Sequence, residues 1–284
     1  MARFTNQAQL SYNDSVINSN VAVGEVLEVL SATKTAVMDD YVRGDDVTYV
    51  ISVINSGSFA ITGVSISDNL GAYVFGEQTL YPLSYVDGSV RVYINGVLQA
   101  TPAVVAGPPL VFSGMTIPAN SNLILIYEAE ANQFAPLAVG DSIVNVATIT
   151  GAGLPGPVTA TETVTPEEEP DLTITKSIEP VPVTENGTLT YRFIIQNYGN
   201  TEAVATDNVA LRDTFDPILS GVTVSLDGVT WTEGTEYNYD ETTGVFATVP
   251  GQITVPAATY TQDPDTGVWV VTPGVTTLVV TGTV

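Results

Sequence analysis

Short runs of apolar and β-branched residues recur along the chain, and most are bounded by Gly, Pro, Asn or Asp. In residues 190–196 apolar and polar positions partly alternate, as expected for a strand with one face in a core. Asp87-Gly88 and Asn95-Gly96 are turn signals with a strand between them. No run has a clear helical period, and none is long enough to span a bilayer. The predicted strands include residues 47–54, 64–67, 90–94, 123–128, 188–196, 222–226, 268–272 and 276–280.

Many short strands at this spacing predict an all-β protein made of antiparallel, immunoglobulin-like β-sandwiches. The composition agrees, because 24 Gly and 17 Pro punctuate a chain that is 44% hydrophobic. That apolar content is enough for two cores and argues against disorder. A length of 284 residues fits two domains of ordinary size.

The chain contains two copies of one unit. Each copy has a lysine strand, a tyrosine strand that ends in Asn-x-Gly, an aspartate at the end of a further strand, and a Pro-Ala turn. We expect residues 30–168 to form the first sandwich and residues 169–284 the second, joined by a stiff acidic stretch with two prolines at 165–170. The paired landmarks are Lys34 and Lys176, Tyr49 and Tyr191, Asn55 and Asn197, Asp68 and Asp213, and Pro118 and Pro256.

The two copies differ at their ends. Copy one finishes with two strand-like segments, 143–149 and 158–164, whereas copy two stops at Val284 before either. A similar pair of strand-like segments, 4–10 and 21–26, precedes copy one and has the same Asn-x-Ala spacing. We therefore predict that residues 1–29 form a donor hairpin that completes copy two of another molecule, because an open sheet edge recruits strands from other chains. The predicted donor positions are Phe4, Asn6, Ala8, Leu10, Val21 and Val23.

Donor and acceptor lie at opposite ends of the chain, so their contact is heterologous and generates an open filament or a ring. Two alternatives remain open at this point. The hairpin could fold back onto copy two of its own molecule and give a closed monomer. It could also be a disordered tail whose similarity to copy one is accidental.

The only two lysines of the chain, Lys34 and Lys176, occupy the same position in each copy. A first-strand lysine, a middle-strand acid and a last-strand asparagine are the set needed for an intramolecular Lys–Asn isopeptide bond. Burial would lower the lysine pKa and raise the aspartate pKa, giving a neutral nucleophile beside a proton-carrying acid. We predict one bond within copy one and one between subunits; the alternative is an ordinary surface lysine with Asn and Asp in turns. The residues are Lys34, Asp68 and Asn145 for the first bond, and Lys176, Asp213 and Asn6 of the next chain for the second.

Charge and missing residue types exclude several functions. Seven basic residues stand against 31 acidic ones, a net charge of −24, which excludes nucleic acid and disfavours an anionic membrane surface as partners. With no Cys and no His there is no disulfide and no usual general base. No cofactor or metal is expected, and no turnover enzyme. Calcium sites at Asp39-Asp40, Asp45-Asp46 or Asp263-Pro264-Asp265 are an alternative, but they lack the ligand spacing of a known calcium loop.

The landmarks begin with a lysine strand, Thr-Lys-Ser at 175–177 in copy two, and end with Asn-x-Ala-Thr-Ile-Thr, at 145–150 in copy one. Their order resembles the bacterial cell-surface repeat family known as domain of unknown function eleven. The chain is also similar to structural proteins of clostridial spore appendages. The resemblance implies immunoglobulin-like sandwiches on a cell or spore surface. We expect a structural subunit of an extracellular fibre that binds copies of itself head to tail and, in addition, other appendage or surface proteins.

The alternative function is a surface adhesin or carbohydrate-binding module. Five aromatic residues of copy two could form a platform for sugars. They are Trp231, Trp269, Tyr237, Tyr239 and Tyr260.

Overall fold

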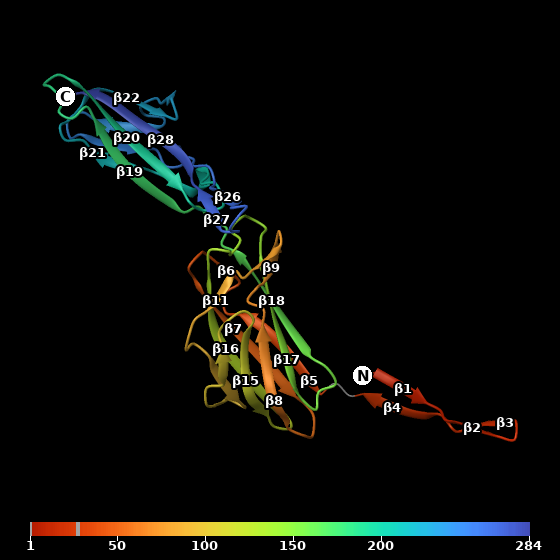
Figure 1. Ribbon diagram of the computed structural model, residues 1–284. Helices are drawn as coiled ribbons and strands as arrows, with labels where there is room; N and C mark the ends of the chain where they lie inside the picture. Colours follow the sequence, from red (N-terminus) through yellow and green to blue (C-terminus); the bar gives the residue numbers. More distant parts are fainter. Residues whose placement is uncertain (1, 27–28) are drawn as a thin grey trace. The chain divides into compact units, whose positions relative to one another are not determined.

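The computed structural model describes residues 2–26 and 29–284 (Figure 1). Apart from one 3-10 turn at Ala205–Asp207, every regular element described is a strand, so the predicted all-β sandwich class is confirmed. All eight strands predicted above are also confirmed, with bounds that differ by a few residues. None of the described segments forms a helix with the length and hydropathy needed to cross a membrane.

The chain divides into two compact units. Unit 1 comprises Met1–Asp39, Gly44–Ala131 and Val144–Val164, and unit 2 comprises Asp40–Arg43, Asn132–Ile143 and Thr165–Val284. These bounds place the short segments 40–43 and 132–143 with the second unit. The stretch predicted as the joint begins inside a strand, because β18 continues to Pro166.

Unit 1 is a sandwich of two sheets. The first has the order β13-β12-β16-β7-β5, with β11 on the free part of β16. The second has the order β14-β15-β8-β17-β18-β6. The first-sheet strands are β5 (Leu30–Ala36), β7 (Asp46–Asn55), β11 (Leu83–Tyr85), β12 (Arg91–Ile94), β13 (Val97–Leu98) and β16 (Ser121–Ala131). The second-sheet strands of unit 1 are β8 (Ile61–Asp68), β14 (Ala103–Val105), β15 (Leu110–Ile117), β17 (Ile143–Ala152) and β18 (Val158–Pro166). β6 (Asp40–Tyr41) pairs with Thr165 and Pro166 at the end of β18, and these residues belong to unit 2 by the bounds above. β9 (Tyr73–Phe75) and β10 (Gln78–Leu80) form a small separate hairpin.

Alternation along the strands builds the core of unit 1. In β16, alternate residues from Ser121 to Ala131 are buried and their neighbours are half-buried or exposed. Strand β7 follows the same rule, and Tyr49 lies directly opposite Tyr127 of β16. A period of two puts one set of side chains between the sheets and leaves the other set outside.

Unit 2 repeats the first sheet but has a smaller second sheet. Its first sheet has the order β19-β20-β28-β22-β23, and the second has only β21-β25-β24. An additional hairpin, β26-β27, is inserted after the Pro256-Ala257 turn. The strands are β19 (Leu172–Glu179), β20 (Thr188–Asn197), β21 (Arg212–Thr214), β22 (Ser220–Leu226), β23 (Val229–Thr230), β24 (Tyr237–Asp240), β25 (Val245–Thr248), β26 (Thr259–Gln262), β27 (Trp269–Thr272) and β28 (Gly274–Thr283).

The Asn-x-Gly landmark has the same structural role in both units. Asn55 is fully buried, donates from Nδ2 to the carbonyls of Phe59 and Pro118 at 2.9 Å each, and accepts from the Gly57 amide at 3.0 Å. Asn197 accepts from the Gly199 amide at 2.9 Å in the same way. The asparagine thus satisfies the backbone groups that a strand leaves unpaired where it ends.

Residues 2–26 form a long hairpin of four short strands. Strand β1 (Ala2–Asn6) pairs with β4 (Ala22–Val26), and β2 (Gln9–Tyr12) pairs with β3 (Ser15–Asn18). The turn residues Asn13 and Asp14 have φ of 44° and 60°, as a two-residue type I′ turn requires. The single strand predicted for residues 4–10 is interrupted at 7–8, where the Ala8 amide donates to Ser19 Oγ at 2.9 Å.

Candidate cross-link site and strand-acceptor groove

Lys34 of β5 and Asp68 at the end of β8 form an ion pair between the two sheets of unit 1. Lys34 Nζ lies 2.6 Å from Asp68 Oδ2, and both side chains are fully buried. The ammonium also lies 4.6 Å from the ring centroid of Tyr49 and 5.8 Å from that of Tyr127. The structure therefore places two of the three predicted residues in direct contact within an aromatic enclosure.

Asn145 of β17 completes this group, but it meets the aspartate through a tyrosine. Ala147 pairs with Asp68, and Asn145 lies two residues before it on the same inner face. The Tyr127 hydroxyl donates to Asp68 Oδ2 at 2.7 Å and accepts from Asn145 Nδ2 at 3.2 Å. Asn145 Oδ1 is buried and is without a hydrogen-bond partner in the described structure, which leaves the amide carbonyl unstabilised.

The electrostatics of this site favour a reactive lysine. Burial lowers the pKa of Lys34 from 10.5 to about 8, although Asp68, and more weakly Glu162, act in the opposite direction. Burial raises the pKa of Tyr127 well above its ordinary value, and the Asp68 charge adds to the rise. A buried lysine with a lowered pKa reaches the neutral, nucleophilic form more readily than a surface lysine does.

Unit 2 holds the equivalent lysine and aspartate in an unfinished site. Lys176 Nζ contacts Asp213 Oδ2, but the lysine side chain is 41% exposed and the aspartate side chain 20% exposed. The ammonium lies 4.6 Å from the Tyr191 ring and 5.6 Å from the Phe215 ring. The aromatic base of the site is present, and one side is open to solvent.

The open side follows from the sheet topology. In unit 1, β8 pairs with β15 on one edge and with β17 on the other. In the part of the chain that the structure describes, the equivalent strand β21 pairs with β25 alone. The edge that β17 occupies in unit 1 is therefore unpaired in unit 2, and such an edge can accept a strand.

An apolar groove lies beside this edge. Ile174 and Ile178 of β19 are 54% and 42% exposed, whereas their equivalents on β5, Ala32 and Ala36, are half-buried. The groove has a volume of about 350 Å³. Its apolar walls are Leu172, Ile174, Ile195, Val209, Leu211 and Ile253.

The N-terminal hairpin carries the complementary apolar surface. Every side chain described from residue 4 to residue 23 is exposed, including Phe4 at 55% and Leu10 at 63%. Isolated two-stranded hairpins are at best marginally stable in water, and exposed apolar patches mark interaction sites. This hairpin therefore has the character of a binding element.

The register separates the predicted donor residues. Asn6 pairs with Ala22, and Phe4 pairs with Gly24. Val23 pairs with Thr5 and so lies on the opposite face from Asn6, while Val21 falls between strands. The pairing shifts by one residue between the two parts of the hairpin, because an irregularity near Ser19 adds one residue to the returning strand.

Sequence reasoning missed Tyr127, the residue that joins Asp68 to Asn145. The available signal was a tyrosine at an inward position of the strand 123–128, opposite a second tyrosine. Buried hydroxyls require partners, so two facing tyrosines in a core indicate a polar group between the sheets.

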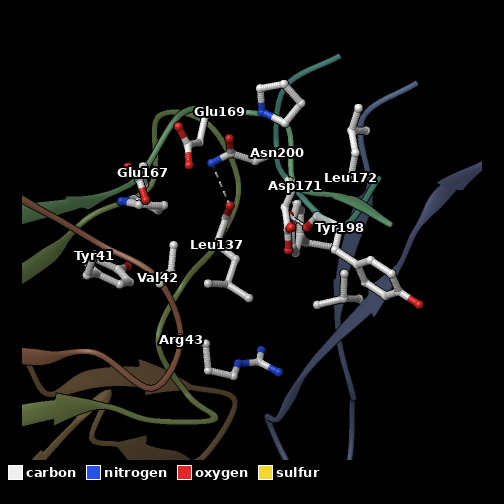
Figure 2. Close-up of a pocket in the computed structure, with 15 residues that line it drawn as sticks. Tyr41, Val42, Arg43, Leu137, Glu167, Glu169, Asp171, Leu172, Tyr198 and Asn200 are labelled. Carbon is white, nitrogen blue, oxygen red and sulfur yellow. Dashed lines mark hydrogen bonds between the residues drawn. The ribbon is translucent and has the colours of Figure 1, made fainter. Parts of the chain in front are cut away.

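The other candidate sites have ordinary structural surroundings. Unit 2 has a pocket of about 500 Å³ whose lining includes Glu167, Glu169 and Asp171, and Figure 2 shows Asn200 above it, donating to the Leu137 carbonyl at 3.1 Å. Among the residues the structure describes, no group of three or more acidic side chains is placed to hold a metal, at this pocket or at the three aspartate pairs considered for calcium.

Two of the five aromatic residues of copy two belong to the sandwich core and not to an exposed platform. Tyr237 is buried and packs on Phe246 with ring centroids 5.7 Å apart. Tyr239 lies against Phe215 and donates to the Leu219 carbonyl at 3.0 Å. These side chains serve the sandwich core rather than a sugar-binding face.

The fold and these sites define an all-β protein with two immunoglobulin-like sandwiches, the second with an open sheet edge. No protein-family model and no curated protein matches the sequence. The chain is similar in fold to BcpA, the major pilin subunit of Bacillus cereus, at 13% identity over 96% of this chain and 73% of that one, with a TM-score of 0.39.

Two other solved structures are similar at the same level. The RrgB pilus backbone of Streptococcus pneumoniae is 16% identical over 86% of this chain and 55% of its own, with a TM-score of 0.36. The collagen-binding domain of a Staphylococcus aureus adhesin is 12% identical over 49% of this chain and 99% of its own, with a TM-score of 0.32. Identity this low transfers no activity or partner to this chain.

Proposed function

We propose that this protein is a structural subunit of an extracellular bacterial fibre or spore appendage, which assembles head to tail by β-strand complementation. The observation that carries the proposal is the open edge of β21 beside an apolar groove, in a chain whose N-terminal hairpin exposes apolar side chains. The hairpin of one subunit adds to the edge of β21 in the next, and the groove receives its apolar face.

The first unit supplies the expected register. There Ala147 pairs with Asp68, and Ile149 pairs with Ile66. By the repeat, Ala8 of the donor pairs with Asp213 and Leu10 pairs with Leu211, a wall residue of the groove. Asn6 then takes the place of Asn145 and faces Lys176.

We further propose that the two lysine sites form Lys–Asn isopeptide bonds. The proton of Lys34 passes to Asp68, and the neutral Nζ attacks Cγ of Asn145. The Nζ–Cγ bond forms and the Cγ–Nδ2 bond breaks; Nδ2 takes one of the two protons that Nζ gives up and leaves as ammonia, while Asp68 keeps the other. Lys176 reacts with Asn6 of the next subunit in the same way, after the donor hairpin has covered the exposed lysine.

Two full-length variants test the assembly. Leu10→Asp puts a charge on the apolar face of the hairpin and leaves an intact groove; Ile174→Asp puts a charge in the groove and leaves an intact hairpin. Both residues are exposed in the subunit, at 63% and 54%, so neither change disturbs a core. We expect each variant alone to stay monomeric and an equimolar mixture to form heterodimers, measured by sedimentation velocity.

Matched controls are available on the opposite faces of the same strands. Ser11→Asp and Thr175→Asp introduce the same charge at exposed positions one residue away. Both controls should polymerise like the natural protein. Filaments of Leu10→Asp alone, or a mixture that remains monomeric, would contradict strand complementation. A closed monomer, in which the hairpin folds back, would be seen as a natural protein that stays monomeric at all concentrations.

A further inference from the structure

The hydroxyl of Tyr127 touches both the acid and the amide of the cross-link site in unit 1. It donates to Asp68 Oδ2 at 2.7 Å and accepts from Asn145 Nδ2 at 3.2 Å. Nδ2 is the atom that must leave as ammonia when the bond to Lys34 forms. The hydroxyl therefore contacts both Asp68, the proton carrier, and Nδ2 of Asn145, the leaving group.

We propose that Tyr127 is a catalytic proton relay that delivers the proton of Asp68 to the leaving nitrogen of Asn145. The inference rests on the cross-link proposed above and adds a residue to it. Asp68 receives a proton from Lys34 at Oδ2, where the lysine contact and the tyrosine contact meet.

The proton balance of the relay closes without any further reactant. When Lys34 attacks Cγ, Nδ2 changes from a planar amide nitrogen to an amine with a free lone pair. The Tyr127 hydroxyl turns toward that lone pair, gives up its proton, and takes the proton of Asp68 in the same event. The nucleophilic nitrogen loses its second proton to Asp68, the Cγ–Nδ2 bond breaks, and ammonia leaves. Tyr127 ends protonated, and Asp68 ends with the proton that Lys34 released second.

The tyrosine is suited to relay a proton without holding a charge. It is fully buried, and burial raises its pKa well above the ordinary value, so it does not ionise on its own. Its ring is fixed by Tyr49, stacked at 5.5 Å, and by Phe112 at 5.4 Å. A fixed ring keeps the hydroxyl within reach of both partners.

The second site lacks this hydroxyl. Register equates Tyr127 with Val280, because Tyr49 pairs with Tyr127 and Tyr191 pairs with Val280. The stacking place on Tyr191 is taken instead by Phe215, at 4.5 Å. Phe215 supplies an aromatic ring but no proton, so the relay is a property of unit 1.

The test follows bond formation in the full-length chain. The protein is isolated in the unfolded state, and its intact mass is checked to show that no bond has formed. It is then refolded by dilution, and the loss of one ammonia from unit 1 is followed over time by intact mass and peptide mapping. Tyr127→Phe keeps the ring and removes only the hydroxyl. Tyr85→Phe is the matched control, because its hydroxyl is also buried near this cluster but contacts neither Asp68 nor Asn145.

We expect Tyr127→Phe to slow the Lys34–Asn145 bond on the order of a hundredfold while circular dichroism reports normal refolding. Tyr85→Phe should react at the natural rate. A Tyr127→Phe rate within about threefold of the control would overturn the relay and leave the cross-link standing. If the natural chain loses no ammonia, the cross-link itself fails and the relay falls with it.

A second measurement covers the case in which Tyr127→Phe fails to refold. Uniform replacement of tyrosine by 3-fluorotyrosine keeps every ring and hydroxyl but makes the phenol more acidic. A relay predicts a changed rate of ammonia loss in this protein at constant folding rate. An unchanged rate would exclude proton transfer through Tyr127.

Discussion

Leu10 gives the sharpest quantitative test of the proposed joint. It is 63% exposed in the subunit, whereas its equivalent in the completed sandwich, Ile149, is fully buried. Docking the hairpin would therefore bury most of a leucine side chain against Leu211 and Ile253. Leu10→Ala removes that contribution and changes nothing buried in the free subunit.

The expected size follows from the exposed area that is lost. Full burial of a leucine side chain stabilises by about 1.5–3 kcal/mol, and a partly relaxed cavity adds to the cost of truncation. We take about 2 kcal/mol, which corresponds to a dissociation constant about 30-fold weaker. Because the contact lies at the joint, the stability of either unit in the monomer should not change.

The assay uses the two assembly-blocked variants, so that only one joint forms. The acceptor carries Leu10→Asp, and the donor carries Ile174→Asp with Asn6→Ala, which removes the covalent step and makes binding reversible. The dissociation constant is compared between this donor and the same donor with Leu10→Ala, by fluorescence anisotropy with a label on the donor. Ser11→Ala, on the other face of the hairpin, is the control.

A change of less than about threefold for Leu10→Ala would refute the reasoning, because a side chain that enters the groove cannot be truncated at so small a cost. The same conclusion would follow if Ser11→Ala weakened binding as much as Leu10→Ala. In either case the hairpin would bind in another register or at another surface.

Three further predictions follow from the described contacts. The first concerns pH. Lys34 and Asp68, flanked by Glu162, Tyr49 and Tyr127, share one proton below about pH 8, the pKa of Lys34, and lose it above. Because the leaving nitrogen needs that proton, the rate of ammonia loss in unit 1 should fall about tenfold per pH unit above pH 8, and a rate that keeps rising would contradict the mechanism. The Lys176–Asn6 bond should form more slowly than the Lys34–Asn145 bond once subunits have docked, because Phe215 offers no hydroxyl; peptide mapping during assembly compares the two. Asn55→Ala leaves buried backbone groups unpaired and should lower the free energy of unfolding of unit 1 by about 2–4 kcal/mol in chemical denaturation, with Thr62→Ala as an exposed control that changes little.

The strands and the repeat were predictable because each depends on local pattern. Alternation in 123–128, turn residues at Asn95-Gly96 and the twice-repeated Asn-x-Gly all act within a few residues of the chain. The contact between Lys34 and Asp68 could also be predicted from the sequence, because the chain has only two lysines and they occupy the same place in both copies.

Other features depended on the relation between strands. The faces of the hairpin are one example, because an irregularity near Ser19 shifts the register by one residue and puts Val23 on the other face from Asn6. The role of Tyr127 required knowing which residue of β16 lies above Asp68. Alternation identifies an inward position but does not say which inward side chains of two different sheets meet.

The sequence by itself determined the fold class, the two copies and the residue types at each lysine site. Hydrophobic period, turn chemistry and repeat spacing depend only on residues close together in the chain. Only the tertiary structure decided that Lys34 is enclosed while Lys176 is exposed. The two lysines have similar neighbours in sequence, a threonine before each and a hydroxyl residue after it. Their difference comes from β17, which covers one sheet edge and has no counterpart on β21 in the part of the chain described. Burial, and with it the lowered pKa of Lys34, is a property of the strands packed around a residue and not of the residue itself.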